Sequence, residues 1–241
     1  MNIDPPPLPK RGSSNQEDTV DTTTEMAVRA RPPRSILKAL RVRVVPSSVV
    51  RPLIKREHYL HSMPGAALCC FGVYLEDALV GAVVFTAGMR QGHRLLDAAR
   101  PQDVVTLSRL WLSDALPPNS ESRVLGIVLR ALRRTTSWKL ILSYADPVAG
   151  HRGTIYQASG WLYLGQTEAN IYIDLGDGKL YHPRSVYGLF GSNSVSHLRA
   201  THVPATRVQV SGKHRYAYVL DPNWRWRLSR ATLPYPRPAE S

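Results

Sequence analysis

The feature that most constrains the fold is residues 138–143, an almost continuously apolar segment directly behind an amphipathic helix pattern. Proline and capping residues at 117–122 predict the start of that helix, and Val124 and Val128 begin an apolar face that continues to about Thr135. A strand that is apolar at successive positions has both faces covered, as in the middle of a sheet that carries helices. We therefore expect an α/β domain with a covered central sheet.

Shorter patterns predict the other elements. The expected strands are 41–45, 67–75, 79–86, 104–112, 161–167 and 171–175, the last two as a closing hairpin, and the other helices are 49–60 and 154–159. This order matches the acyl-CoA N-acyltransferase-like (GNAT) fold, a central mixed sheet flanked by helices. We expect that catalytic domain at 36–180, a disordered arm at 1–35 and a basic, aromatic-rich extension at 181–241.

The charge balance points to a polyanionic partner. Lys and Arg number 31 against 18 Asp and Glu, which gives a net charge of +13 and favours nucleic acid. The two cysteines, Cys69 and Cys70, are adjacent, which excludes a disulfide scaffold and a zinc finger. No apolar stretch has the length of a membrane span or resembles a signal peptide, so we expect no membrane partner and a non-secreted, cytoplasmic protein.

The densest group of reactive side chains lies at 143–158, after the covered strand, where α/β sheets collect ligand sites. Asp146 is a candidate to orient or deprotonate an amine, and His151 to act as acid or base near neutral pH. Tyr144 and Tyr156 supply phenols. The structural alternatives are Asp146 as a turn residue before a proline and Tyr156 as core.

Three further sites are candidates. His58 and His61 lie three residues apart at a predicted helix end and so are expected to share a helical face. With Asp146 they suggest a metal site, although exposed histidines explain the spacing as well. Arg109, next to Ser108 inside an expected strand, needs either an acidic partner or a cleft to face. The start of the long helix offers backbone N–H groups for the pyrophosphate of an acyl-CoA or related donor, unless its residues merely cap the helix: Asn119, Ser120, Glu121, Ser122 and Arg123.

Four ordered blocks, 56–65, 107–110, 119–122 and 143–158, together resemble the Mom family of bacteriophage DNA-modification proteins over about residues 40–175. The resemblance implies an acyltransferase-like enzyme that converts adenine in DNA to a carbamoylmethyl derivative at its exocyclic amine and so protects the DNA from host restriction. It implies double-stranded DNA as substrate in the host cytoplasm and lends weight to an iron requirement. It also adds weight to these residues: His58, Ser108, Arg109, Ser122, Tyr144, Asp146, His151 and Tyr156.

Two other functions remain open from the sequence. The same scaffold suits an acetyltransferase that acts on a protein or a small amine, and it also suits a DNA-binding protein without catalysis. The basic surface favours DNA, because contacts to phosphates supply most non-specific affinity for it. Aromatic side chains serve a separate need, since a paired adenine must leave the base stack before its amine can react.

Overall fold

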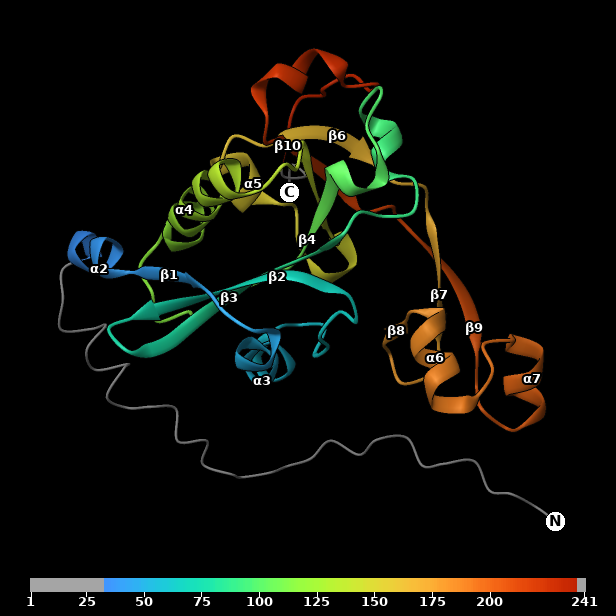
Figure 1. The fold of residues 1–241 in the computed structure, drawn as a ribbon. Coiled ribbons are helices and arrows are strands. Elements are labelled where there is room, and N and C mark those ends of the chain that lie inside the picture. The colour runs from blue at the N-terminus through green and yellow to red at the C-terminus, as the bar shows by residue number, and fades with distance from the viewer. Residues whose placement is uncertain (1–32, 238–241) are drawn as a thin grey trace. The chain divides into compact units, whose positions relative to one another are not determined.

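The computed structural model describes residues 33–237, which form two compact units. The larger unit contains residues 33–145, 151–165 and 214–237, and the smaller contains 146–150 and 166–213. The expected arm at 1–35 lies outside the described residues, except for 33–35, which begin the first helix of Figure 1.

The larger unit is built on a seven-stranded sheet in the order β1-β2-β3-β4-β5-β10-β6. Its strands are β1 (Arg41–Val44), β2 (Ala67–Leu75), β3 (Ala78–Ala87), β4 (Val104–Leu112), β5 (Leu140–Ala145), β6 (Leu162–Gln166) and β10 (His214–Val219). Its helices are α2 (Pro33–Ala39), α3 (Ser47–Glu57), α4 (Ser120–Thr135) and α5 (Thr154–Ala158), with 3-10 turns η1 (Gly92–Leu95), η2 (Pro101–Asp103) and η4 (Pro222–Arg227). The β4–β5 pair is parallel and the β3–β4 and β5–β10 pairs are antiparallel. The predicted mixed α/β sheet is confirmed.

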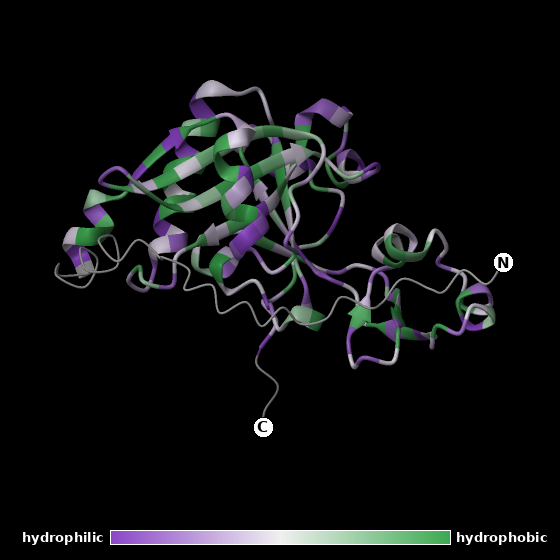
Figure 2. Ribbon diagram, turned by 90° about the horizontal axis from the view of Figure 1, so that it is seen from below, coloured by the Kyte–Doolittle hydropathy of each residue, from purple (hydrophilic) through white to green (hydrophobic). Residues whose placement is uncertain are grey.

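Helices cover both faces of this sheet (Figure 1). Successive residues of a strand point to opposite faces, and β3 shows the result. Val83 and Phe85 join the core beneath α4, whereas Ala82 and Val84 pack with Val50 and Ile54 of α3. Hydrophobic residues accordingly predominate along the strands in Figure 2. This two-sided burial explains why β5 is apolar at successive positions.

The pairing of β4 with β5 is short, and this positions the candidate site. Only Val104, Val105 and Thr106 of β4 are in register with β5, opposite Leu140–Leu142. The antiparallel pairing with β3 continues, and it includes Arg109 opposite Val84. The second half of β4 therefore follows β3 rather than β5, and Arg109 lies near the end of α3.

The smaller unit has a three-stranded sheet, β8-β7-β9, with two helices. The elements are η3 (Pro147–Ala149), β7 (Asn170–Asp174), β8 (Leu180–Tyr181), α6 (Pro183–Phe190), α7 (Val195–Ala200) and β9 (Thr206–Val210). Ile173, Val186 and Leu198 belong to its own buried core. At its base the Thr167 N–H donates to the Lys213 carbonyl oxygen at 2.9 Å, and a Cβ on Gly212 would overlap the Thr167 carbonyl oxygen. Only glycine fits there.

Two features differ from the sequence-based expectation. The segments 161–167 and 171–175 do not form a hairpin, because β6 belongs to the large sheet and β7 to the small one. Residues 166–213 instead form a separate unit, and β10, which lies inside the expected extension, pairs with β5. A boundary at 180 therefore does not coincide with either unit. None of the helices in the described chain has the length and apolar composition that crossing a bilayer requires.

Candidate active site

The loop after α3 buries the side chain of His58. Val50, Leu53 and Ile54 anchor the helix to the sheet, and the helix ends at Glu57 because His58 adopts extended dihedral angles, φ −75° and ψ 134°. The chain then turns sharply, with His61 at a φ of 45°. His58 is left only 5% exposed, although it is polar and lies next to an exposed loop.

The hydrogen bond at His58 defines its tautomer. The backbone N–H of Leu60 donates to Nδ1 of His58 at 3.1 Å. A backbone N–H can only donate, so Nδ1 carries no proton and the neutral ring holds its proton on Nε2. Burial first, and then the charges of Arg109, His151 and His61, lower the pKa of His58 to about 4. Near neutral pH, His58 is therefore an uncharged group that donates a hydrogen bond through Nε2.

Tyr59 connects His58 to the loop after β5. Its ring stacks on His58 with the centroids 4.6 Å apart, and it meets the edge of His151 at 4.8 Å. Tyr59 and His151 are both exposed, whereas His58 is buried. The three rings thus run from the interior to the surface, with two imidazoles separated by a phenol.

Arg109 fixes the far end of the same loop. Its Nε donates to the Ser62 carbonyl oxygen at 2.9 Å and its Nη2 to the Ser62 hydroxyl at 3.2 Å, while Nη1 donates to the Ser108 carbonyl oxygen at 2.7 Å. None of the ion pairs among residues 33–237 includes Arg109. A cation is therefore held beside His58 without a carboxylate to neutralise it, which makes this site electropositive.

Ser108 is tied to a neighbouring strand rather than to a base. Its hydroxyl lies 2.6 Å from the Thr86 hydroxyl on β3 and 3.4 Å from the Thr106 carbonyl oxygen. A serine nucleophile needs a hydrogen-bonded base such as an imidazole, and in the described chain no such bond reaches Ser108. Its contacts support β-sheet structure and the placement of Arg109.

Tyr156 and Tyr144 are held by packing. Burial raises the pKa of Tyr156 to about 12, its hydroxyl is hydrogen-bonded to Ser143 at 2.8 Å, and its ring contacts Trp161 and Tyr216. Tyr144 is half-buried on β5 opposite Arg215 of β10, and burial raises its pKa as well. A phenol whose pKa is raised stays protonated near neutral pH and so is not available to accept a proton. The interpretation of Tyr156 as a core residue therefore fits its surroundings.

Asp146 belongs to the smaller unit, and both of its oxygens have partners there. Oδ1 accepts the backbone N–H of Val148 at 3.0 Å and so caps η3, while Oδ2 lies 2.8 Å from the ammonium group of Lys213. Burial raises the pKa of Tyr172, whose hydroxyl interacts with both Lys213 and Asp146. Asp146 is thus a buried member of an ion pair, which is a structural environment for a carboxylate.

The predicted metal set does not fit these surroundings. His58 and His61 do not share a helical face, because α3 ends before them. His58 has no nitrogen lone pair to offer a metal, since Nδ1 accepts from Leu60 and Nε2 carries the proton. Among residues 33–237, no group of three or more His, Cys, Asp or Glu side chains is placed to hold a metal ion. The structure gives no support to iron at His58, His61 and Asp146.

The start of α4 suits an anionic donor in its backbone more than in its side chains. Asn119 has a φ of 70°, and no side chain in the described chain caps the helix. The hydroxyls of Ser120 and Ser122 turn back, to the carbonyl oxygens of Pro117 and Asn119 at 2.6 and 3.1 Å. The Ser120 and Arg123 N–H groups donate to the Pro117 and Asn119 carbonyl oxygens, so the N–H groups of Glu121 and Ser122 and the positive end of the helix dipole remain to bind phosphate. Arg123 is exposed beside them, whereas the acidic Glu121 would oppose an anion.

Three residues of these sites were not identified from the sequence. Tyr59 lies inside the predicted helix 49–60, Ser62 was not a candidate by itself, and Lys213 lies in the basic, aromatic-rich extension. Their roles depend on contacts across long sequence separations, such as Arg109 with Ser62 and Lys213 with Asp146. Only the residue block 56–65 pointed toward Tyr59 and Ser62, and nothing local distinguished Lys213 from other basic residues.

Comparisons with known proteins are consistent with one family. The Mom protein family model matches residues 39–237. The methylcarbamoylase Mom of Escherichia phage Mu is 30% identical over 207 residues, which cover 83% of this chain and 85% of the relative.

Solved structures similar to this chain include two N-acetyltransferases. Spermidine N-acetyltransferase from Vibrio cholerae, in complex with CoA and spermine, has 9% identity and a TM-score of 0.43, covering 76% of this chain and 96% of that one. An N-acetyltransferase from Staphylococcus aureus Mu50 has 11% identity and a TM-score of 0.41, covering 75% of this chain and 97% of that one. Because the family match spans every strand of the seven-stranded sheet and continues to the end of the described residues, the chain belongs to the Mom protein family.

Proposed function

We propose that this protein is a phage DNA-modification enzyme that places a carbamoylmethyl group on the exocyclic amine of adenine in double-stranded DNA. The observation that carries the proposal is the family match over residues 39–237, together with a methylcarbamoylase relative that spans most of both chains. The modification would protect phage DNA from host restriction, and the protein would work in the cytoplasm of the host cell. A net charge of +13 supports DNA as the partner.

In this proposal the loop after α3 carries the chemistry. Nε2–H of His58 donates a hydrogen bond to the carbonyl oxygen of the group being transferred, and Arg109 provides a fixed positive charge nearby. Donors and charges that are held in place before the reaction stabilise developing negative charge without reorganisation. The site's excess of positive charge favours an anionic transition state over a cationic one.

His151 is the candidate base of the same site. The adenine amine loses a proton as its new N–C bond forms, and the donor's leaving group departs with the electron pair. An exposed imidazole on a glycine-flanked loop can reach that proton, and the edge contact with Tyr59 keeps it near His58. Tyr59, itself 43% exposed, is available to stack against an adenine extruded from the duplex.

The donor is proposed to be an acyl-CoA or a related molecule bound at the start of α4. The product joins the amine to the CH2 carbon of the carbamoylmethyl group, so the donor would supply that group with its leaving group on the CH2 carbon, because attack on a thioester carbonyl would give an amide instead. The backbone N–H groups of Glu121 and Ser122 would hold its phosphates, helped by the side chain of Arg123. Glu121 makes this a weaker anion site than a glycine- and arginine-rich loop would be.

The test is the nucleoside content of DNA from bacteria that express the full-length protein. We expect a deoxyadenosine derivative with the mass of a carbamoylmethyl adduct in digested DNA, which is absent when the vector is empty. Soluble, folded protein that leaves deoxyadenosine unmodified in these cells would refute the proposal. An acyl adduct on cellular protein or on a polyamine, with DNA unchanged, would identify the acetyltransferase alternative instead.

A further inference from the structure

A hollow of about 260 Å³ lies in the larger unit. It is at the edge of the seven-stranded sheet where β10 and β6 are the outermost strands. It is lined by Leu162 of β6, Tyr218 of β10, Pro222 and Arg225 of η4, and Arg133 near the end of α4. Figure 1 shows η4 beside β10 and β6, at the other end of the sheet from β1 and α3. This hollow is therefore separate from the loop after α3 that contains His58, which is called the His58 loop below.

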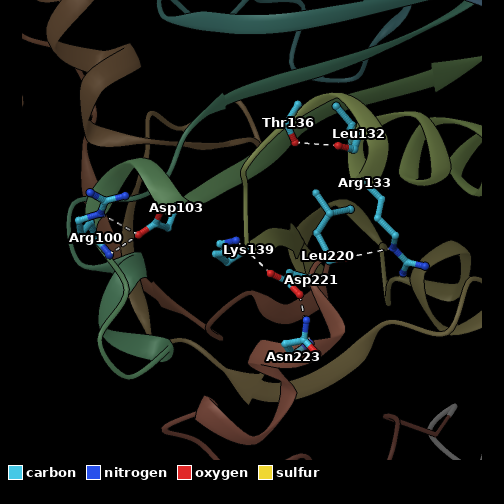
Figure 3. Close-up of polar contacts among 9 residues, drawn as sticks. All are labelled: Arg100, Asp103, Leu132, Arg133, Thr136, Lys139, Leu220, Asp221 and Asn223. Atoms are coloured by element: carbon cyan, nitrogen blue, oxygen red, sulfur yellow. Dashed lines mark hydrogen bonds and ion pairs between the residues drawn. The ribbon is translucent and has the colours of Figure 1, made fainter.

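Two arginines that line the hollow, Arg133 and Arg225, have no acidic partner within the described residues. None of the ion pairs in the described part of the chain includes Arg133 or Arg225. The nearby carboxylate of Asp221 is already engaged, because Lys139 lies 2.9 Å from its Oδ2 and the Asn223 N–H donates to its Oδ1 at 3.1 Å (Figure 3). The charge of the two arginines is thus available to a ligand.

Arg133 is also held in a fixed orientation. Its Nε donates to the Leu220 carbonyl oxygen at 3.0 Å (Figure 3), and its Nη2 donates to the Tyr218 hydroxyl at 3.1 Å. A guanidinium has five N–H donors, so further donors remain after these two bonds. An oriented guanidinium is suited to a phosphate because its planar N–H groups match two oxygens at once.

The surface next to the hollow is cationic and aromatic. The guanidinium of Arg227 lies between two rings, 4.7 Å from the centroid of Trp224 and 4.5 Å from that of Trp226. Trp226 is 76% exposed. These contacts order η4, which carries Arg225, and Arg227 adds a third cation near the hollow.

The size of the hollow limits the ligand. Pockets that bury a drug-sized molecule have volumes of roughly 300–1,000 Å³, so this one is small for a whole nucleotide but adequate for one phosphate group. We propose that Arg133 and Arg225 hold a backbone phosphate of the duplex DNA, as a contact distinct from the His58 loop. The identity of the ligand rests on the proposed DNA substrate, whereas binding at this site needs no catalysis.

The experiment measures duplex binding by the full-length protein from about 50 to 200 mM salt. The test variant combines Arg133→Gln with Arg225→Gln. The matched control combines Arg130→Gln with Arg134→Gln, two exposed arginines of α4 that do not line the hollow. We expect the test variant to lose at least about tenfold in affinity at low salt and to reduce the slope of log K against log salt by about 0.9 per lost phosphate contact. The control should keep a slope close to wild type.

The single variant Arg225→Gln controls for misfolding. Replacing Arg133 also removes its hydrogen bonds to Leu220 and Tyr218, whereas replacing Arg225 leaves them in place. It should reduce the slope by about 0.9 while the melting temperature stays unchanged. Equal slopes for the test and control variants would overturn the inference. Loss of coenzyme A binding in the test variant with an unchanged DNA slope would also overturn it and reassign the hollow to donor phosphates. A reduced slope in a protein that never modifies adenine would refute only the proposed function.

Discussion

The loop after α3 and the segment after β5 each bury an ionisable side chain, but only the segment after β5 places an opposite charge beside it. Asp146 is buried with a cation 2.8 Å away and with a backbone N–H on its other oxygen. His58 is buried beside a cation, so its own positive form is disfavoured and it stays neutral. A charge that is fully matched stabilises a fold, whereas a donor beside an unmatched charge is available to a substrate. We propose from this comparison that Asp146 is a structural residue and that His58 takes part in the chemistry.

Of the changes considered, we expect replacement of Arg109 to cause the largest loss of DNA modification. Arg109→Met removes both the charge and the bonds to Ser62, and we expect modification to fall by about 10²- to 10³-fold. The pKa of His58, measured by NMR titration, should rise because a cause of its depression is gone.

The matched variant Arg109→Lys keeps the charge and loses the fork of bonds to Ser62. The pKa of His58 should then stay low, while modification still declines because the loop is less well held. Burial alone keeps the pKa of His58 below its ordinary value, so the decisive comparison is with wild type: a pKa of His58 in Arg109→Met that is no higher than in wild type would show that Arg109 acts only through packing.

The second effect is a loss of stability in acid. The folded protein holds the pKa of His58 at about 4, below the ordinary value of 6.5, so between these values the unfolded chain binds the proton more readily. The free energy of unfolding that His58 contributes is complete above pH 6.5 and is lost as the pH falls toward 4, by up to about 3 kcal/mol.

Urea unfolding of wild type and His58→Asn across this range isolates that contribution. Asparagine keeps an acceptor for the Leu60 N–H and does not titrate. The difference between the two proteins should therefore change between pH 6.5 and 4 and be constant outside that window. A difference independent of pH would mean that His58 is not kept neutral by the fold.

We expect the smallest effect on DNA modification from replacing Asp146, the carboxylate that is paired with Lys213. Asp146→Asn keeps the cap on η3 but removes the negative charge opposite Lys213. Because Lys213 is 31% exposed and also interacts with the Tyr172 hydroxyl, the free energy of unfolding should fall by about 1–2 kcal/mol, less than for a fully buried pair. Lys213→Met in the same chain should recover part of that loss, as a double-mutant cycle would show. Modification per folded molecule should stay near wild type, whereas its abolition would restore Asp146 as the reacting base.

The fold was predictable from local patterns, but the separate unit was not. Apolar runs defined β2 to β5, and capping residues with helical periodicity defined α3 and α4, because each such element buries its own face in the core. Residues 161–175 read equally well as a hairpin, since a strand pattern does not say which sheet the strand joins.

The candidate site was predictable in residue type but not in role. The motifs singled out His58, Arg109 and Asp146, yet their protonation and pairing depend on Leu60, Ser62 and Lys213. A spacing of three residues predicted a shared helical face for His58 and His61, and the early end of α3 removed it.

The most direct test of the account compares His58→Asn with Asp146→Asn in cells, at matched amounts of soluble protein, by nucleoside mass spectrometry of the DNA. Asparagine removes the Nε2–H donor at one position and the carboxylate charge at the other, in each case with its backbone N–H acceptor kept. We expect His58→Asn to reduce modified deoxyadenosine by about 10²- to 10³-fold, while Asp146→Asn retains it. Full modification by His58→Asn, with none by Asp146→Asn, would contradict the account and place the chemistry at the end of β5.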